Sequence, residues 1–429
     1  MFLSKLIKII NGESNIDSYF IIKEIKTDTR KLNEGDIFIA LKGDKYDGNN
    51  YVEDAIKKGC IACITNKYIS DKCIVVKDTY KSLFDIGNYI RNKHNIPVIA
   101  ITGSNGKTTT KELIVHILKT KYNVLYNKES LNNLIGVSDV LFKLNNKYDI
   151  CVLELGSNHI GEISLLSKLC NPTTSIIVNI GTSHIGYFKK KKNIFKEKLS
   201  ILDGMKNNNL IVNGDDQYLK KLNYFKCGIN KNNNLQAYNI QESIDSILFN
   251  IKLDKEYTIK FNNPGKHFIT NILLAIKVCM DYGINIDDIV NSINNFKLID
   301  KRMNVFKLED NTIINDCYNA SFESVKAGLN YMKKINQNKI FIIGDLLELG
   351  KFSKRIHKKI NRLLKKIKNK QVYTIGRYSK YIKGISFNNV NEMISYLKNK
   401  KFNNSYIYIK GSRRNNLDLV VEYLKKRAI

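Results

Sequence analysis

The stretch IPVIAITGSNGKTTTKELIVHILKT, residues 96–120, decides the fold class of this chain. Its apolar start predicts a buried strand, its glycines predict a tight turn, and its last residues have the apolar spacing of a helix. A strand, a Gly-rich turn and a helix in this order direct backbone N–H groups and the positive helix end at phosphate oxygens. Lys107 can reach terminal phosphates and the Thr108 hydroxyl can ligate Mg²⁺. The stretch therefore predicts an ATP site, although Ile101 stands where the common G-x-x-x-x-G-K-[ST] loop has its first glycine.

The segments around this loop alternate between apolar runs and helical patterns. Such alternation is typical of a doubly wound parallel sheet, and we expect a domain of this kind over residues 85–300. A polar tract near 226–236, KCGINKNNNLQ, is expected to form a loop or the edge of a hairpin. The strands of the domain are expected at 97–102, 149–154, 174–180 and 210–213.

The two flanking regions predict further α/β domains. Residues 1–84 are rich in turns and contain the short strand DIFIAL ahead of the helix-like VEDAIKKG. After Arg302 the alternation begins again, with strands in KIFIIGD, QVYTIG and SYIYIKGS, which predicts a Rossmann-like domain over 301–429. A chain of 429 residues is long enough for about three domains. The predicted class is α/β, with a small N-terminal domain, a central P-loop ATPase-like domain and a C-terminal Rossmann-like domain.

The composition argues against several classes of protein. The net charge is +30, but the excess is nearly all Lys and is spread along the chain beside Asn and Ile, so we expect no nucleic-acid partner. The start, MFLSKLIKIING, is too short an apolar run for a signal peptide or a membrane span, and no later run approaches that length. We therefore expect a cytoplasmic protein without membrane insertion. The eight cysteines, including the CxxC pair Cys60 and Cys63, are expected to be reduced core residues.

Three polar side chains follow expected strands, at the edge where an open parallel sheet binds its ligands. Glu154 ends the strand DICVLELG, and a carboxylate beside a triphosphate is a natural Mg²⁺ ligand. His184 follows the strand TSIIVNIGTSH and is a candidate second metal ligand or a hydrogen-bond donor to phosphate. Lys198 lies on the next expected helix, where an ordinary solvated lysine is the alternative interpretation.

Several ordered motifs resemble those of the Mur ligase family across nearly the whole chain. TGSNGKTTT is similar to the family's ATP loop, NKESLNNLIGV to the Asn-rich segment after it, and LELGSNHIGEI and NIGTSHIGYF to its Glu and His motifs. TDTRKLNEGDIFIALKGDKYDG resembles the family's uridine-nucleotide motif. NDCYNASFESVKAGL resembles the D-x-YNA-x-P-x-S segment of the branch that adds a dipeptide, and GDLLELG, His357 and KGSRR complete that branch's pattern.

This resemblance implies a role for each matching residue. Lys107, His184, Lys198 and Arg302 are the implied catalytic residues. The implied metal ligands, for two Mg²⁺ sites, are Thr108, Glu154, His184 and Lys198, of which Lys198 matches a lysine that family members carbamylate. Contacts to a uridine-nucleotide substrate are implied for Thr27, Asp28, Thr29, Arg30, Lys42 and Gly43, and contacts to its muramoyl peptide for Asn132 and Asn133. ATP contacts are implied for Gly103, Ser104, Asn105, Gly106, Lys107, Thr108, Thr109, Asn271, Arg302, Asp316, Tyr318 and Asn319.

The activity that the resemblance implies is ATP-dependent amide-bond formation by a monomer. The implied substrates are UDP-N-acetylmuramoyl-tripeptide and D-alanyl-D-alanine, whose product is a peptidoglycan precursor. In the expected chemistry, a substrate carboxylate attacks the γ-phosphate of ATP, and an amine then displaces phosphate from the acyl phosphate. Three alternatives stay open: a sister ligase that adds diaminopimelate or lysine, a folylpolyglutamate synthase, and a basic nucleotide-switched binding protein.

Four residues depart from the family pattern. Phe268 stands where the family has Asn after the His, Ser321 replaces Asn, Phe322 replaces Pro, and Ser200 replaces Glu near the implied carbamate. The change at Phe268 has the clearest chemical consequence, because it removes a hydrogen-bonding amide near the expected nucleotide.

Overall fold

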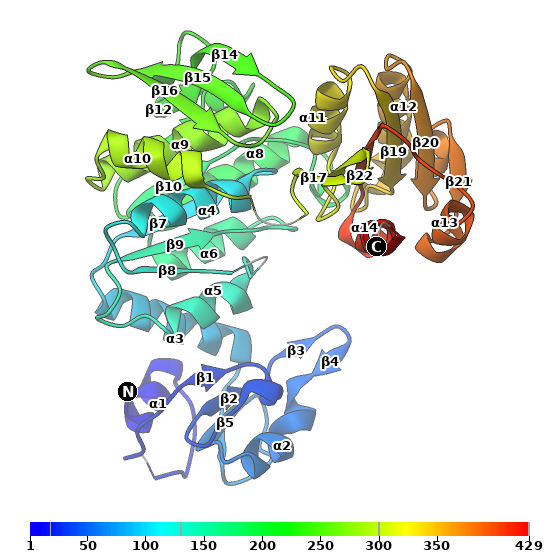
Figure 1. Ribbon diagram of the computed structural model, residues 1–429. Coiled ribbons are helices and arrows are strands. Elements are labelled where there is room, and N and C mark those ends of the chain that lie inside the picture. The colour runs from blue at the N-terminus through cyan, green and yellow to red at the C-terminus, as the bar shows by residue number, and fades with distance from the viewer. Residues whose placement is uncertain (18, 129–130, 299–300, 428–429) are drawn as a thin grey trace.

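The computed structural model describes residues 1–17, 19–128, 131–298 and 301–427. Figure 1 shows an N-terminal α/β body at the bottom, a central body above it and a C-terminal body at the side. Each body is built on its own sheet with parallel strands, so the predicted α/β class is confirmed. No helix in the described part of the chain is both long and apolar enough to cross a membrane.

The N-terminal body has a parallel sheet of order β1-β2-β5-β6. Leu3, Leu6 and Ile10 form the buried stripe of its first helix, at the spacing by which a helix presents one face to a core. A small antiparallel hairpin, β3-β4, projects from the sheet on the side that faces the C-terminal body (Figure 1). The elements are α1 (Leu3–Ile10), β1 (Ile25–Lys26), β2 (Ile37–Ile39), β3 (Lys42–Gly43), β4 (Tyr46–Asp47), α2 (Val52–Lys57), β5 (Ala62–Thr65) and β6 (Cys73–Val75).

The central body has a seven-stranded parallel sheet of order β13-β12-β11-β10-β7-β9-β8. The strand that leads into the glycine turn, β7, lies between β10 and β9, so the carboxyl ends of these three strands meet at one edge. The strands are β7 (Val98–Thr102), β8 (Val124–Tyr126), β9 (Ile150–Glu154), β10 (Thr174–Ile177), β11 (Leu210–Asn213), β12 (Phe225–Gly228) and β13 (Leu235–Gln236). The helices are α3 (Thr79–Lys93), α4 (Lys107–Leu118), α5 (Leu134–Leu141), α6 (Glu162–Cys170), α7 (Ile185–Phe188), α8 (Lys191–Leu199), α9 (His267–Asp281) and α10 (Ile286–Asn295).

Two details of the central sheet differ from the sequence-based expectation. The expected strand 174–180 leaves the sheet after Ile177, because Asn179 turns to bond the glycine turn. The tract 226–236 contains the expected loop over 229–234, but the strands on either side of it, β12 and β13, pair in parallel and not as a hairpin. Asp215 explains this path, since its carboxylate accepts hydrogen bonds from Ile229 N and Asn230 N and turns the connecting loop back along the sheet.

A three-stranded antiparallel sheet, which we did not predict, extends the central body beyond β13. Its strands are β14 (Tyr238–Glu242), β15 (Ile247–Lys252) and β16 (Glu256–Phe261). Burial alternates strictly along β15 and β16, because one face packs on the core and the other faces solvent.

The C-terminal body has a six-stranded sheet of order β17-β18-β22-β19-β20-β21. Only its edge hairpin β17-β18 is antiparallel, and the other neighbours run in parallel as a Rossmann-like sheet requires. The strands are β17 (Asn304–Leu308), β18 (Asn311–Asn315), β19 (Asn338–Gly344), β20 (Lys370–Ile375), β21 (Ile385–Phe387) and β22 (Ser405–Lys410). The helices are α11 (Phe322–Met332), α12 (Ser353–Leu364), α13 (Val390–Leu397) and α14 (Asp418–Arg427).

Helix α3 joins the N-terminal and central bodies. It packs against α1 on one side and against α5 and α6 on the other, so the expected boundary between residues 84 and 85 lies inside a continuous helix. We propose that α3 is the shared junction of these two domains, and that the second boundary lies near residue 300.

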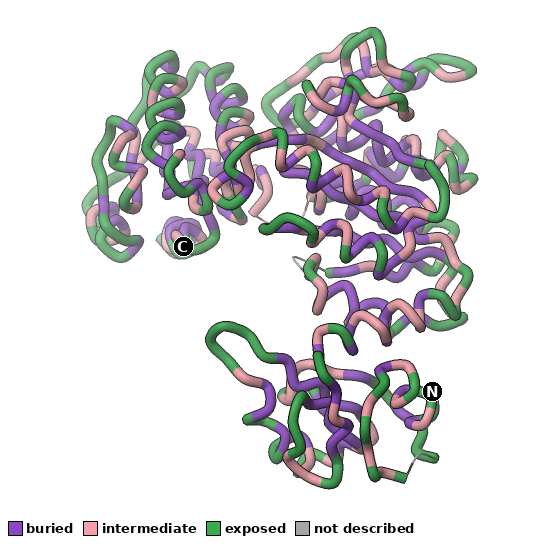
Figure 2. Tube along the Cα trace, turned by 180° about the vertical axis from the view of Figure 1, so that it is seen from behind, coloured by how far each residue is buried: buried purple, intermediate pink, exposed green. Residues whose placement is uncertain are grey.

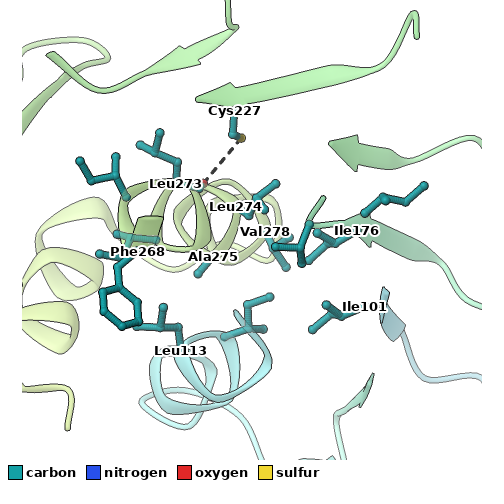
Figure 3. Packing of buried hydrophobic residues seen from close by; sticks show 14 of the residues in the cluster. Ile101, Leu113, Ile176, Cys227, Phe268, Leu273, Leu274, Ala275 and Val278 are labelled. Carbon is teal, nitrogen blue, oxygen red and sulfur yellow. Dashed lines mark hydrogen bonds between the residues drawn. The ribbon is translucent and has the colours of Figure 1, made fainter. Parts of the chain in front are cut away.

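The core follows the parallel strands and the helices that cover them, as the purple segments of Figure 2 show. Figure 3 shows Ile101 of β7 and Ile176 of β10 facing the buried side of α9, with Leu113 of α4 opposite. In the same view Cys227 points at α9, where its thiol lies 3.7 Å from the carbonyl oxygen of Leu273. All eight cysteines are buried and unpaired, as expected for core residues.

Candidate active site

The turn after β7 is shaped by two glycines. Gly103 has φ +150°, and a Cβ there would lie 3.0 Å from Val178 of the neighbouring segment. Gly106 has φ +81° and begins α4, and a Cβ there would lie 2.8 Å from Oδ1 of Asn271. Only glycine satisfies both the backbone conformation and the close approach. The turn consequently opens directly onto the N-terminus of α4, whose free N–H groups attract anionic oxygens.

Residues beyond β10 hold this turn in place. Asn179 accepts a hydrogen bond from Asn105 N and donates one to Asn105 O, both at 2.9 Å. Ser104 Oγ accepts from Gly181 N at 2.8 Å. The phosphate cradle is therefore preorganised by its neighbouring strand end.

Glu154 is the buried carboxylate at the centre of the site. Its Oε2 accepts from Thr108 Oγ1 at 2.6 Å and its Oε1 accepts from Asn132 Nδ2 at 2.7 Å. Lys107 Nζ donates to Gly103 O at 3.0 Å, and burial lowers the pKa of Lys107. A hydroxyl and a carboxylate beside a phosphate cradle are the hard oxygen donors that Mg²⁺ prefers, so these residues fit that ion.

The side chain of Asn127, which the sequence analysis did not select, binds the backbone of Glu154. Its Oδ1 accepts from Glu154 N at 2.9 Å, and its Nδ2 donates to Glu154 O at 2.9 Å and to Leu131 O at 2.7 Å. The buried Lys111 ammonium donates to the carbonyl oxygen of Asn127. This amide fixes the carboxylate and the Asn132 loop relative to each other, although nothing in its sequence spacing marks it.

Lys198 is buried, contrary to the solvated alternative. Its Nζ donates to Ser157 Oγ at 2.8 Å. Burial lowers the pKa of Lys198 to about 7, and the nearby Lys107 cation lowers it further while Glu197, Glu162 and Glu154 oppose the shift. A substantial fraction of this amine is therefore neutral near pH 7, which is the form that reacts with CO₂.

His184 begins α7 and contacts the C-terminal body. Its Nδ1 lies 2.7 Å from Oε2 of Glu348, and this hydrogen bond lowers the pKa of Glu348. Gly186 N donates to Glu348 O at 3.0 Å. His184 lines the same cavity as Glu154, but its partner here is a carboxylate of another domain. Among the described residues no three His, Cys, Asp or Glu side chains form a group that could hold a metal ion, so Mg²⁺ would need the Thr108 hydroxyl and ligand oxygens as well.

The C-terminal body closes the site through three further contacts. Arg302 Nη2 donates to Thr108 Oγ1 at 3.0 Å, and its guanidinium lies 4.0 Å from the ring centroid of Tyr318. Ser321 Oγ donates to Asn105 Oδ1 at 2.7 Å. Glu323 accepts from both the backbone and the hydroxyl of Thr182. These bonds join the glycine turn to the start of α11.

Asp316 lies beneath this closure as one half of a buried ion pair. Lys410 Nζ donates to Asp316 Oδ2 at 2.6 Å, and Tyr408 OH donates to the same oxygen at 3.0 Å. Lys410 also donates to Asn319 O at 3.1 Å. The pair neutralises the carboxylate and fixes the segment that contains Tyr318 and Asn319.

One cavity of about 620 Å³ unites these groups. It includes His267 and Lys410, which the sequence analysis did not select; His267 follows a Pro-Gly pair at a helix start, a signal that could have indicated it. The predicted residues that line it are Gly103, Ser104, Asn105, Gly106, Lys107, Thr108, Thr109, Asn132, Asn133, Glu154, His184, Lys198, Asn271, Arg302, Asp316, Tyr318 and Asn319.

The six predicted uridine-nucleotide residues lie apart from this cavity, in the N-terminal body. Asp28 forms a bidentate pair with Arg30 at 2.9 Å, and this hydrogen bond lowers the pKa of Asp28 to about 2. Thr27 precedes this pair and Thr29 lies within it. Lys42 and Gly43 form β3 of the exposed hairpin. These six residues lie on a surface separate from the cavity. A substrate that contacts both places would have to extend from one to the other.

The four departures from the family pattern are accommodated locally. Phe268 is buried against Phe261, with ring centroids 5.3 Å apart. Ser321 caps α11 by accepting from Ser324 N, and Ser200 Oγ donates to Glu197 O at 2.7 Å. Phe322 takes the first position of α11, with Lys359 Nζ 5.7 Å from its ring centroid.

Three family models match consecutive parts of the chain. The Mur ligase family catalytic domain matches residues 21–100, the Mur ligase middle domain matches 101–279, and the Mur ligase glutamate ligase domain matches 301–413. Together they span the three bodies in the order of the chain.

Individual proteins are similar over almost the whole length. A UDP-N-acetylmuramoyl-tripeptide–D-alanyl-D-alanine ligase of Buchnera aphidicola subspecies Baizongia pistaciae is 34% identical, covering 94% of this chain and 93% of the relative. The enzyme of the same name from Bacillus subtilis is 30% identical, covering 84% and 82%. The crystal structure of MurF from Acinetobacter baumannii superposes with a TM-score of 0.92 at 27% identity, covering 99% of this chain and 98% of that one. By the fold, the cavity and these similarities, the chain belongs to the Mur ligase family.

Proposed function

We propose that the protein is an ATP-dependent ligase that joins UDP-N-acetylmuramoyl-tripeptide to D-alanyl-D-alanine. The observation that supports this most is the single cavity in which the glycine turn, Glu154, Lys198 and the C-terminal Arg302 converge. The relatives with this activity match nearly the full length of the chain, which supports the dipeptide-adding reaction over the addition of a single amino acid. The proposed product is the pentapeptide precursor of peptidoglycan.

The proposed reaction has two steps. The terminal carboxylate of the tripeptide attacks the γ-phosphorus of ATP, which forms an acyl phosphate and releases ADP. The amine of the dipeptide then attacks the acyl carbon, loses a proton and expels inorganic phosphate, so that one amide forms for each ATP consumed. Little covalent chemistry is required of the protein, whose part is positioning and charge neutralisation.

Each residue of the cavity has a role in this scheme. The turn from Gly103 to Thr109 binds the phosphates through backbone N–H groups, and Lys107 neutralises the transferring phosphoryl group. Arg302, which donates a hydrogen bond to Thr108, lies near the same phosphates. Its guanidinium neutralises the negative charge that develops on the leaving ADP. Thr108 and Glu154 would hold Mg²⁺, in up to two sites with His184 and Lys198, and the ion supplies charge neutralisation at the phosphate oxygens.

Lys198 is proposed to be carbamylated. Its pKa of about 7 favours the neutral amine, and Ser157 Oγ lies 2.8 Å from its nitrogen. Reaction of the neutral amine with CO₂ forms an N–C bond and releases one proton, which leaves an anionic carbamate; starting from the ammonium, two protons are released in all. The Lys107 cation, which contributes to the lowered pKa of Lys198, would attract that anion.

The three domains would divide the substrates between them. The uridine nucleotide is proposed to bind at Thr27, Asp28, Thr29, Arg30, Lys42 and Gly43, and its peptide to reach Asn132 and Asn133 at the cavity. Closure by the C-terminal body excludes water, which would otherwise hydrolyse the acyl phosphate. We propose that the enzyme acts as a monomer in the cytoplasm.

The test is phosphate release by the purified protein with ATP and Mg²⁺. We expect release only when UDP-N-acetylmuramoyl-tripeptide and D-alanyl-D-alanine are both present, and a product heavier than the tripeptide nucleotide by the dipeptide less water. Replacing the dipeptide with diaminopimelate or lysine, and the tripeptide nucleotide with its shorter precursor, tests the sister activities. Release that is indifferent to both substrates would contradict the ligase and favour a nucleotide-switched binding protein.

A further inference from the structure

His357 is a buried histidine of α12 that the proposed reaction does not use. Its side chain is fully buried, beside Ile356 and Ile360 on the inner face of the helix. Leu346 N donates a hydrogen bond to its Nε2 at 3.2 Å, and its Nδ1 lies 2.8 Å from Ser353 O, one helical turn earlier. Because a backbone N–H can only donate, Nε2 must carry the lone pair, and the proton of the neutral ring is on Nδ1. The two hydrogen bonds therefore fix the tautomer of the imidazole.

The bond to His357 holds a loop, residues 345–350, that follows β19 and reaches the cavity. The cavity-lining residues of this loop are Leu347, Glu348 and Leu349. His357 binds the N–H just ahead of them, and Ser412 binds the next, since Leu347 N donates to Ser412 Oγ at 2.9 Å. Two side chains from other segments thus anchor the loop before it enters the cavity.

The backbone of Glu348 needs such anchors. Its φ is +62°, in the left-handed region that residues with a Cβ seldom adopt. A strained backbone persists only where the surrounding structure fixes it. Glu348 O accepts a hydrogen bond from Gly186 N at 3.0 Å, and a Cβ at Gly186 would lie 2.6 Å from that oxygen. The loop and α7 are therefore in direct backbone contact, which a displaced loop would lose.

The same loop places a carboxylate against His184. Glu348 Oε2 lies 2.7 Å from His184 Nδ1. A carboxylate on one nitrogen of an imidazole orients the ring and leaves the other nitrogen for a ligand. Given the proposed function, on which this step rests, that ligand is Mg²⁺ or a phosphate oxygen. The orientation of His184 in the cavity thus depends on contacts that begin at His357, inside the C-terminal body.

We propose that His357 is a positioning residue, which holds the loop 345–350 through the bond that it accepts from Leu346. The path that this bond maintains is the one that brings Glu348 to His184. Without the acceptor, the buried N–H of Leu346 would lose its hydrogen bond, and leaving a buried donor unsatisfied is costly. The loop would have to move to satisfy that N–H, and the contact with α7 would be lost.

Two substitutions of His357 test the acceptor. Glutamine and methionine are unbranched side chains of similar size, and both remove the ring and its bond to Ser353. Only glutamine has an oxygen that can take the place of Nε2, so His357→Gln keeps an acceptor for Leu346 and His357→Met does not. Thermal unfolding shows whether both variants are folded. Any difference between them in the behaviour of the loop then reports the acceptor.

Hydrogen–deuterium exchange with mass spectrometry follows the loop without requiring activity. In peptides that cover 345–350 and α7, we expect exchange to rise by about tenfold or more in His357→Met and to stay within about threefold of the wild type in His357→Gln. The control is His116→Met, since His116 packs on Phe296 outside the cavity and should leave both peptides unchanged. Equal exchange in the two His357 variants, or unchanged exchange in His357→Met, would overturn the proposal.

Kinetics connect the loop to the reaction. For His357→Met we expect kcat to fall by about tenfold or more, because the cavity is no longer preorganised. KM for the uridine nucleotide should change by less than about twofold, because its proposed contacts lie in the N-terminal body. His357→Gln should restore most of the loss, and equal kcat values in the two variants would contradict the proposal. If the wild type forms no product, the proposed function fails, while the exchange measurement still decides the role of His357.

Acid should act on the wild type as the loss of the acceptor does. Burial lowers the pKa of His357, while the bond to Ser353 and the carboxylate of Asp345, 3.9 Å from Nε2, oppose this shift. The other titratable side chain packed on the ring is Tyr378, whose ring centroid is 6.1 Å away. Protonation turns Nε2 into a donor that faces the N–H of Leu346, so loop exchange, corrected for its intrinsic pH dependence, should rise below about pH 6.5. His357→Gln should lack this rise, and the same rise in both proteins would overturn the proposal.

Discussion

At the scale of single residues, burial changes the chemistry of two lysines. Lys107 and Lys198 are both enclosed by the central body, and burial lowers the pKa of each. A lysine at the surface has neither the fixed geometry nor the altered protonation that phosphoryl transfer and carbamate formation require. The sequence marks Lys107 by its place after a glycine turn, whereas among 70 basic residues Lys198 has no such local mark.

Removing the Lys107 ammonium should nearly eliminate catalysis without unfolding the protein. For Lys107→Ala we expect turnover to fall by about 10³-fold or more, because a preorganised charge at the transferring phosphate is lost. Phosphate release measures turnover, and circular dichroism reports the fold. Lys119→Ala, at the exposed end of the same helix, is the control. Comparable losses in both variants would contradict a specific role.

The carbamate assignment predicts chemical rescue at Lys198. Lys198→Ala should lose activity by about 10²-fold or more, and a short carboxylic acid such as acetate should restore part of it by supplying an anionic group. The same acid should not stimulate Lys107→Ala. A folded Lys198→Ala that no small carboxylate rescues would count against the carbamate.

The lowered pKa of Lys198 also predicts how the free energy of unfolding depends on pH when CO₂ is absent. Its folded pKa of about 7 lies below the ordinary value of 10.5, so the unfolded chain binds more protons between these values. Stability contributed by this site should therefore rise as pH increases from about 7 to about 10.5. Denaturant titrations of the wild type and Lys198→Met across this window should give a smaller slope for the variant. Identical slopes would mean that the amine is not buried as described.

At the scale of elements, the start of α4 depends on a glycine for two separate reasons. Gly106 has a positive φ, and its missing Cβ leaves room for Asn271. Gly161 at the start of α6 also has a positive φ, but a Cβ there would meet nothing within 4 Å. Comparing substitutions at Gly106 and Gly161 therefore separates the effect of backbone strain from the effect of a clash between a Cβ and Asn271.

We expect Gly106→Ala and Gly161→Ala to lose similar amounts of stability, about 1–2 kcal/mol each, because a Cβ introduces backbone strain at a positive φ. Gly106→Ala should in addition displace Asn271 and weaken ADP binding by tenfold or more, while Gly161→Ala should leave ADP binding unchanged. Thermal unfolding and calorimetry measure the two effects. Equal affinities in the two variants would show that the close approach to Asn271 is unimportant.

At the scale of the whole molecule, the site exists only when the C-terminal body lies against the central one. Polar contacts across this junction include Arg302 to Thr108, Ser321 to Asn105, His184 to Glu348, and Glu323 to Thr182, and buried apolar residues of both bodies belong to one cluster. Interfaces between domains of one chain commonly permit relative domain motion, which an enzyme with three substrates needs for substrate binding and product release.

Loosening this junction should open the molecule. For Glu323→Ala we expect a larger radius of gyration in X-ray scattering and a severalfold higher KM for ATP, because both bonds to Thr182 are lost. Glu392→Ala is the control, since Glu392 also accepts a backbone N–H near a helix start but lies within the C-terminal body. An unchanged scattering profile and KM for Glu323→Ala would show that this contact does not maintain closure.

The parts of the fold that could be predicted from sequence are those with local signals. The strands with long apolar runs were found within one to three residues, and the glycine turn ahead of Lys107 was identified directly. The sheet β14-β15-β16 was missed although β15 and β16 largely alternate apolar and polar residues, a pattern typical of a half-buried strand. Asn127 was missed for a different reason: its amide acts through Glu154 N and Glu154 O, groups 27 residues away.

The sequence by itself determined the α/β class and the phosphate cradle, because strand periodicity, glycine conformation and helix N-termini are local properties of the chain. Its ordered motifs also carry the resemblance to the Mur ligase family. Only the tertiary structure decided that Lys198 is buried, that His184 pairs with Glu348, and that His357 accepts a hydrogen bond from Leu346. Those outcomes depend on which segments meet in space. Burial and close contact between distant residues set pKa values and hydrogen-bond partners, and no local pattern encodes them.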